Sequence, residues 1–403
     1  MTLLDKATLV VTPNGFKASK LYSVIPINGT EDLTAERSTT ANRINESNVL
    51  QLMGLNVSRV DYESGKGVIL AEPQATNYLR SSNVFTQPPY GLSPTASING
   101  TAFLSPDGSN NASLLQVLFS AGFIRRQPNV NLGHYSWSCY VKNPTTGTVT
   151  MRIYTNNTNI IAKIVLSTGQ ITLSGNTVNY VSSRVKLVKN GWYRIGVTFA
   201  STESYINLAL YPTSYPASDN SSCQIYGWQL EKRGETSYIP TTSQIFTRIS
   251  DRFLRQNMFN NGVITSNGGT YFLDLKNNIP RLPPLTNNGC YIGDSLVFGG
   301  NLLSIRAENL IYERLTIAKS TGSNNITTLY TTLTDNVKIA ITWNGSSADV
   351  WVNGVKVVSA TPFTATNMNI FSLDGSDGTK NINSSIVFPA PLSEPELIYL
   401  TTI

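Results

Sequence analysis

The sequence predicts an all-β protein, in which an N-terminal extended segment of short strands is followed by two tandem β-sandwich domains of jelly-roll type. Only 13% of the 403 residues are charged, about half the usual share, while Asn, Thr, Ser and Gly are plentiful and no helical heptads appear. Short stretches with a period of two recur roughly every eight to fifteen residues between turn residues, as in sandwiches. A chain of 403 residues is too long to fold around one ordinary hydrophobic core. We therefore divide the chain into an N-terminal segment (1–80), a first sandwich (81–243), a connector (244–260) and a second sandwich (261–403).

Charge and hydropathy exclude several classes of protein. The formal charge is +6, and the 30 Lys and Arg residues are scattered without a basic run, so no nucleic-acid partner is expected. No run of eighteen apolar residues and no signal peptide is visible, so we expect no membrane insertion and synthesis in a cytoplasm. Of the three cysteines, Cys139 and Cys223 would form a bridge within one sandwich, but buried free thiols are favoured.

The N-terminal segment, 1–80, has short strands near Leu9–Val11 and Lys20–Pro26, separated by the turn Pro13-Asn14-Gly15. From residue 33 to 79 the apolar residues are too dispersed to bury a face. Two interpretations stay open. The segment is a loosely packed extension on the first sandwich, or its strand edges are completed by copies of itself or by a larger assembly.

The first sandwich ends in the strand beginning at Cys223. Its alternation predicts Tyr226 and Trp228 on one face. A charged turn follows, and Pro240 bars continuation as a central strand. Glu231 and Glu235 flank this turn and are expected to be solvated. Upstream, roughly eight strands with turn signals between them complete the sandwich.

The second sandwich carries the strongest local signals. Three strands between Val337 and Val358 are joined by turns at Asn344-Gly345 and Asn353-Gly354. One helical turn is expected after Ser393, its N-cap, with Pro395 near its start. For the connector, 244–260, a short helix and an extended hinge both stay open.

These residues carry a resemblance to known families. The stretch Val337–Val358, followed by 385–388 and 392–397, resembles the concanavalin A-like (laminin-G-like) lectin and glucanase fold. Residues 191–194, 227–231 and 236–242 resemble the carbohydrate-binding-module-like sandwich of bacteriophage fibre and tail proteins. The leader at 34–45, 59–62 and 70–79 is similar to that of such proteins in crAss-like phages of gut Bacteroidetes.

The resemblance implies a structural virion protein, a head or tail fibre (appendage) subunit exposed on the virion surface. It implies a homotrimer, with a dimer as the alternative, that joins other virion proteins through its N-terminal segment. Lectin-like domains would then bind host cell-surface polysaccharide and serve host attachment.

Catalysis is not expected. Glucanases of this fold place acidic residues at alternate positions of one strand, Glu-x-Asp-x-Glu, and no such run exists here. Asp274 and Asp349 stand alone in their strands, and a catalytic triad would depend on the single histidine, His134. The alternatives are a tail-spike polysaccharide depolymerase, whose paired carboxylates would meet across strands, and a structural decoration protein without ligand.

Glycan recognition uses aromatic platforms with polar groups at their edges, although each such aromatic is more often part of a core. Trp351 faces away from Val350 and Val352, which leaves either a concave groove or the inter-sheet core as its place. No cofactor is expected apart from a weak calcium candidate at Asp374 and Asp377, where an ordinary glycine turn is favoured. The glycan-binding candidates are Trp343, Trp351, Asn344, Asn353, Trp192, Tyr193, Trp228 and Tyr226.

Overall fold

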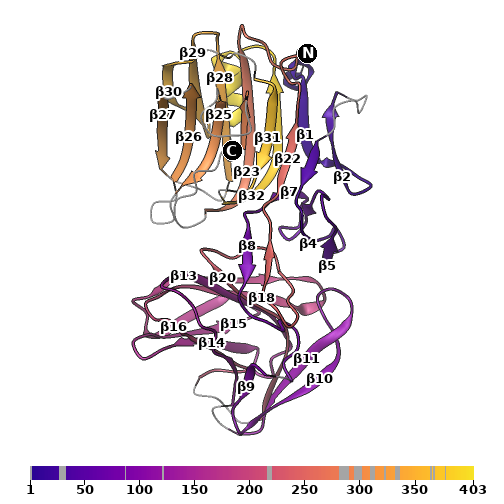
Figure 1. Ribbon diagram of the computed structural model, residues 1–403, viewed down its shortest axis with the longest axis vertical. Helices are drawn as coiled ribbons and strands as arrows, with labels where there is room; N and C mark the ends of the chain where they lie inside the picture. The colour runs from indigo at the N-terminus through magenta and orange to yellow at the C-terminus, as the bar shows by residue number, and fades with distance from the viewer. Residues whose placement is uncertain are drawn as a thin grey trace. The chain divides into compact units, whose positions relative to one another are not determined.

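The computed structural model confirms the all-β class (Figure 1). It describes residues 2–26, 33–86, 88–119, 122–215, 220–280, 290–294, 302–308, 314–321, 324–331, 336–363, 365, 368–376 and 378–403. The chain divides into two compact units. Unit 1 comprises Met1–Thr40, Met53–Gln74 and Ile249–Ile403, and unit 2 comprises Ala41–Leu52 and Ala75–Arg248.

Unit 1 contains two antiparallel sheets. The nine-stranded sheet has the order β2 (Lys20–Ile25), β1 (Leu9–Lys17), β32 (Gly378–Phe388), β23 (Gly269–Pro280), β28 (Asn336–Trp343), β29 (Ser347–Val352) and β30 (Val355–Pro362), with β7 (Val68–Ala71) paired to β32 and β6 (Val60–Asp61) paired to β7. The seven-stranded sheet has the order β27 (Asn324–Thr331), β26 (Arg314–Thr321), β25 (Leu302–Glu308), β24 (Cys290–Gly293), β31 (Ile370–Asp374), β22 (Arg252–Arg255) and β3 (Thr34–Glu36).

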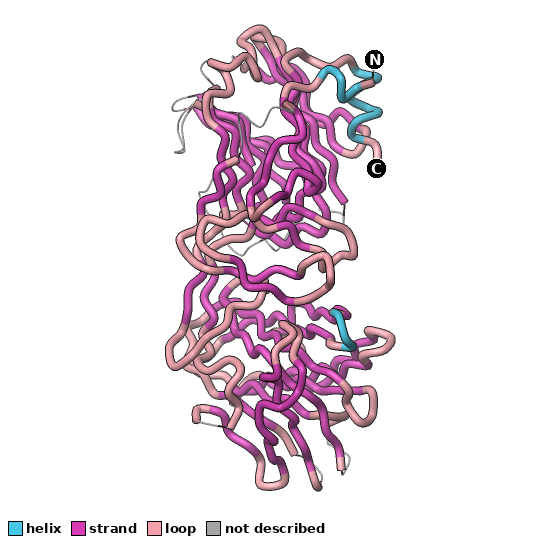
Figure 2. Tube along the Cα trace, turned by 90° about the vertical axis from the view of Figure 1, so that its right-hand side faces the viewer, coloured by secondary structure: helices cyan, strands magenta, loops and turns pink. Residues whose placement is uncertain are grey.

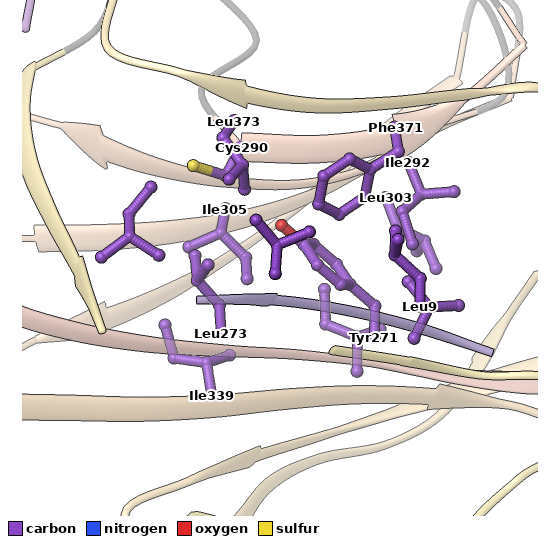
Figure 3. Packing of buried hydrophobic residues seen from close by; sticks show 14 of the residues in the cluster. Leu9, Tyr271, Leu273, Cys290, Ile292, Leu303, Ile305, Ile339, Phe371 and Leu373 are labelled. Carbon is purple, nitrogen blue, oxygen red and sulfur yellow. The ribbon is translucent and has the colours of Figure 1, made fainter. Parts of the chain in front are cut away.

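The inner faces of these sheets form the main core of unit 1. Tyr271 and Leu273 of β23 lie opposite side chains of the other sheet, among them Phe371 of β31 (Figure 3). The rings of Tyr271 and Phe371 meet edge to face, with centroids 6.0 Å apart. Because each large apolar side chain stabilises by about 1.5–3 kcal/mol when fully buried, this layer accounts for much of the unit's stability.

The outer face of the nine-stranded sheet has a smaller apolar cluster. Ala340 of β28 and Trp351 of β29 pack there against Leu392 and Leu397, which belong to helix α1 (Glu394–Thr401) and the segment before it. The predicted start of this helix is confirmed, because Ser393 and Glu396 form a capping box and a proline occupies the first turn. The helix is longer than the single turn expected. The short 3-10 helix η1 (Leu3–Lys6) lies beside it (Figure 2).

Unit 2 is a second sandwich. The β20 sheet has the order β10 (Ala96–Leu104), β11 (Asn110–Val117), β20 (Ser221–Lys232), β13 (Gly133–Lys142), β18 (Tyr193–Ser201) and β17 (Tyr180–Leu187), and the 3-10 turn η2 (Lys189–Gly191) precedes β18. The β14 sheet has the order β16 (Gln170–Asn176), β15 (Asn159–Val165), β14 (Thr148–Tyr154), β19 (Asn207–Tyr211), β12 (Ile124–Arg126) and β9 (Tyr90–Leu92). Two strand pairs complete the unit, β8 (Ala75–Asn77) with β21 (Phe246–Arg248) and β4 (Ala41–Ile44) with β5 (Leu50–Met53).

The faces predicted for Tyr226 and Trp228 of β20 are wrong, because the strand contains a β-bulge. The pairing with β13 shifts register between Ser138 and Tyr140, where Gly227 adopts a φ of 62°. The bulge adds one residue to β20 relative to β13, so the side chains beyond it point to the opposite face from the one that simple alternation predicts. Tyr226 therefore packs on the outer face of the β20 sheet and Trp228 between the two sheets, and not on the same face as predicted.

The first eighty residues, expected as a segment of their own, are built into both units. Strand β1 pairs with β32, and β3 pairs with β22, so strands from the two ends of the chain share sheets (Figure 1). Strands β4 and β5 instead contribute Ile44 and Leu50 to a cluster of unit 2. The connector, 244–260, forms the strands β21 and β22. Strands β2 and β3 are the outermost strands of their sheets, and the pairing of their outer edges with other copies stays a prediction.

The cysteines are buried free thiols, as predicted. None of the helices in the described part of the chain has the length and apolarity that a membrane crossing requires.

Candidate functional site

A cavity of about 220 Å³ lies on the outer face of the nine-stranded sheet, between β28 to β30 and the segment that leads into α1. Val350 and Val352 of β29 point into the inter-sheet core, so Asp349 and Trp351 project from the opposite face. Among the predicted residues, Trp343, Asn344 and Trp351 meet here. The full lining is Thr342, Trp343, Asn344, Ser347, Asp349, Trp351, Lys356, Pro391, Leu392, Glu394 and Leu397.

Trp351 forms the aromatic part of the cavity. Its side chain is only 3% exposed, and its Nε1 is buried without a hydrogen-bond partner among the described residues. Lys356 stands directly opposite on β30, with Nζ 5.7 Å from the ring centroid, a cation–π distance. Any ligand that stacks on this ring must therefore displace Lys356.

The charged groups of the cavity are paired but half-exposed. Lys356 Nζ lies 2.7 Å from Oδ2 of Asp349, with side-chain exposures of 35% and 28%. Exposed pairs of this kind contribute about 0–1 kcal/mol, so both groups can be drawn to a ligand at little cost. Glu394 adds a second carboxylate at the start of α1.

The two predicted asparagines have different roles. Asn344 is exposed, and its Oδ1 accepts hydrogen bonds from the backbone N–H groups of Ser346 and Ser347, which leaves its amide NH₂ as the group to offer a ligand. Asn353 occupies the other hairpin and is not in the described lining of the cavity. Its Oδ1 accepts from Lys338 N at 2.9 Å, so its side chain holds the hairpin to β28.

Trp343 belongs mainly to the core. It is 1% exposed, and its ring meets Phe363 edge to face at 6.5 Å. An added Cβ on Gly269 would lie 2.3 Å from its Cζ2, so the glycine makes room for the indole. The stacking surface predicted for Trp343 is therefore covered.

The unit 2 candidates lie away from any described cavity lining and are largely buried. Trp192 and Tyr226 pack in the outer cluster with ring centroids 6.5 Å apart, and Trp192 Nε1 donates to the carbonyl of Leu104 at 3.1 Å. Trp228 is fully buried between the sheets. Tyr193 is half-buried at the edge of the same core.

One of the motifs that carry the resemblance, at residues 229–241, is structural. Gln229 donates to Glu231 and accepts from the N–H of Ile239, while Thr236 donates both its N–H and its hydroxyl to Glu231. The expected solvation of Glu231 and Glu235 is wrong, because the segment after the turn folds back over them and leaves them 0% and 9% exposed. Burial raises the pKa of Glu231, and its hydrogen bonds with Thr236 oppose this.

The calcium candidate does not fit a cation. Asp374 accepts from Arg252 Nε at 3.2 Å and from the backbone N–H of Ser376 at 2.7 Å, while Lys380 Nζ donates to its carbonyl at 3.1 Å. Two cationic side chains thus contact the residue that would hold the ion. Asp377 lies outside the described residues. Within the described ranges no group of three His, Cys, Asp or Glu side chains has metal-binding geometry.

Sequence reasoning missed Asp349 as a site residue, and it missed Lys356 and the helix residues altogether. Asp349 and Trp351 are two positions apart on one strand, which was the available signal. The placement of Lys356 depends on a cross-strand register with an irregularity, which the sequence did not reveal.

No protein-family model and no curated protein matches the chain. Several solved structures are weakly similar to it, among them the following two. The binding domain of Paraclostridial Mosquitocidal Protein 1 shares 14% identity at a TM-score of 0.29, over 37% of this chain and 40% of that one. Trypanosoma rangeli sialidase in complex with sialic acid shares 9% identity at a TM-score of 0.28, over 72% and 60%. The chain thus spans less than two thirds of either structure, and the similarity is too low to support a function.

Proposed function

We propose that the protein is a non-enzymatic carbohydrate-binding protein whose site is the cavity on the outer face of the nine-stranded sheet. The observation that supports this most directly is the grouping of Trp351 with polar side chains, Asp349 and Asn344 among them, around one open space. An apolar floor with a few placed polar groups is how proteins generally bind small polar ligands.

The dimensions favour a single sugar unit. Pockets that enclose drug-sized ligands measure about 300–1,000 Å³, and this cavity, at about 220 Å³, is smaller. Asp349 would accept hydrogen bonds from sugar hydroxyls, and the amide of Asn344 would donate to them. Because Lys356 must leave the Trp351 ring, binding at one site is expected to be weak, with a Kd near the millimolar range, about −4 kcal/mol.

We further propose that the protein is a fibre or appendage subunit on the surface of a bacteriophage virion, which binds host polysaccharide. The sequence resemblance supports this setting. A homotrimer, or alternatively a dimer, would raise weak binding through avidity. Because residues 9–17 and 68–71 are strands of unit 1, attachment to other virion proteins through these residues would use the surface of a folded unit.

A depolymerase is the second candidate, because Asp349 and Glu394 both line the cavity and glycosidases use two carboxyl groups. The ion pair of Asp349 with Lys356 favours binding instead. Lys356 Nζ lies 2.7 Å from Oδ2 of Asp349 and so occupies one of the carboxylate oxygens that a glycosidase would use for proton transfer or for attack on the sugar.

A glycan array followed by titration calorimetry on the full chain tests the proposal. Asp349→Asn is expected to weaken binding of the best glycan about tenfold, the cost of one hydrogen bond to a charged group. Asp274→Asn is the matched control, since Asp274 is a half-buried aspartate of the same sheet outside the described lining, and it should bind as wild type does.

Two results would contradict the proposal. A folded protein that gives no array signal would indicate a structural subunit without ligand. Release of reducing sugar from host polysaccharide, lost in Asp349→Asn, would establish the depolymerase.

A further inference from the structure

Unit 2 contains a buried arginine that its own fold does not neutralise. Ile124 and Arg126 are two residues apart on β12 and share a face, and Ile124 is part of the core between the sheets. Arg126 is 5% exposed, whereas Arg125 between them is exposed on the other face. The guanidinium of Arg126 thus lies at the margin of the inter-sheet core.

Several hydrogen-bond donors gather there without acceptors. Nε and Nη1 of Arg126 are buried and have no hydrogen-bond partner among the described residues, and the same is true of the hydroxyl of Tyr90. Tyr90 is paired with Arg126 in the strand register, and its ring centroid lies 5.1 Å from the guanidinium carbon. Trp228 Nε1 is another buried donor without a described partner, and its ring is 5.5 Å from that of Tyr90. Buried donors are normally satisfied, so their grouping indicates a missing acceptor.

The charges near Arg126 also indicate that an anion is missing. Burial is the main cause that lowers the pKa of Arg126, and the neighbouring Arg80 lowers it further. Three other buried arginines, Arg37, Arg59 and Arg194, are paired with carboxylates. Arg59 lies between Asp251 and Glu72, and Arg194 contacts Glu235 at 2.9 Å. At Arg126 the described residues that act electrostatically are a tyrosine and a second arginine.

We propose that Arg126, Tyr90 and Arg80 form a binding site for an oxyanion, with the carboxylate of an acidic sugar such as a uronic acid as the ligand. A carboxylate accepts charge-assisted hydrogen bonds from guanidinium N–H groups and would supply acceptors that these donors lack. The exposed Arg80 would attract the anion from solvent, and the Tyr90 hydroxyl would donate to it. This site is separate from the cavity in unit 1 and does not depend on the function proposed for it.

Titration calorimetry at constant ionic strength tests the site, with sodium glucuronate, glucose as the neutral match and inorganic phosphate as a second oxyanion. Saturable binding of glucuronate, without binding of glucose, is expected. Binding of phosphate without binding of glucuronate would support an oxyanion site but show that an acidic sugar is not its ligand. If neither anion binds to the folded protein, the proposal is wrong.

Variants identify the residues that bind the anion. Tyr90→Phe removes only the hydroxyl, and Arg126→Lys keeps the charge but loses the fork of donors. Each is expected to weaken glucuronate binding about tenfold. Arg125→Lys is the matched control on the exposed face of the same strand and should bind as wild type does. Equal losses of affinity in Arg125→Lys and Arg126→Lys would show general attraction by surface charge and overturn the site.

Circular dichroism and the melting temperature establish that each variant is folded. Tyr90→Phe leaves the core volume almost unchanged, so it tests the site even if Arg126→Lys fails to fold.

Discussion

Four buried charges in unit 1 give the sharpest prediction about its stability. Asp251 accepts hydrogen bonds from Arg37 Nη1 at 2.7 Å and from Arg59 Nη2, and Arg59 Nη1 pairs with Glu72 at 2.8 Å. Each of these side chains is at most 3% exposed. They come from the three stretches of chain that make up unit 1. Arg37 lies near the end of the first stretch, Arg59 and Glu72 belong to the second, and Asp251 lies near the start of the third. The cluster therefore joins the three stretches within the unit.

Asp251→Asn keeps the shape of the side chain but removes the negative charge that contacts both guanidinium groups. It also places an NH₂ donor where acceptors are needed. Breaking a buried ion pair in this way costs about 3–5 kcal/mol. For a unit of roughly 150–250 residues, each kcal/mol lowers Tm by about 2–4 °C. The expected decrease in the Tm of unit 1 is therefore about 6–20 °C.

Scanning calorimetry of the full chain measures this decrease. Asp349→Asn is the matched control, because it removes the same charge from a half-exposed pair in the same unit, where the loss is about 0–1 kcal/mol. If Asp251→Asn lowers Tm no more than Asp349→Asn does, the buried cluster does not stabilise the fold and the reasoning is refuted.

Three further predictions follow from other parts of the structure. Gly227→Ala should destabilise unit 2 by about 1–2 kcal/mol in urea denaturation, because φ is 62° and the new Cβ would lie 3.0 Å from Tyr140; wild-type stability would contradict the bulge. Burial raises the pKa of the Cys139 and Cys223 thiols, so mass spectrometry should find both unalkylated by iodoacetamide at pH 8 until the protein unfolds, and labelling in the native state would contradict their burial. Hydrogen bonds from Lys6 and Ser393 lower the pKa of Glu396 to about 2, so its contribution to stability is present above pH 4.5 and is lost as the pH falls through about 2. Lys6→Ala should raise that pKa toward 4.5 in an NMR titration, and an unchanged value would show that Lys6 is not the cause.

The sequence predicted the elements whose signals are local. Each Asn-Gly pair between β28 and β30 forms its hairpin, because an asparagine or glycine at positive φ suits the tight turn. Ser393 and Glu396 similarly mark the start of α1 three residues apart. Such signals are read within a few residues and need no knowledge of the rest of the fold.

Pairings between distant parts of the chain could not be predicted in the same way. Leu9 of β1 lies opposite Val387 of β32, and no local sequence signal near either strand indicates that the two strands pair. Residues 33–79 therefore appeared too sparse for a core, because most of the core into which Leu33, Ile69 and Ala71 pack is supplied from beyond residue 250. The inversion of Tyr226 against Trp228 had one signal, the glycine between them, but glycine in a strand marks a bulge only when its partner strand is known.

Motif residues and cavity residues differ in a way that matters for assigning function. Gln229, Glu231 and Thr236 of the motif at 229–241 are buried and hydrogen-bonded to one another and to the main chain, so a resemblance that rests on them concerns the fold of unit 2. Asp349 and Lys356 of the cavity are half-exposed, and the core of unit 1 does not require them. Their identity can change without loss of the fold. The ligand therefore has to be established from the cavity itself, by exchanging Asp349 and measuring binding, whichever family the buried motif resembles.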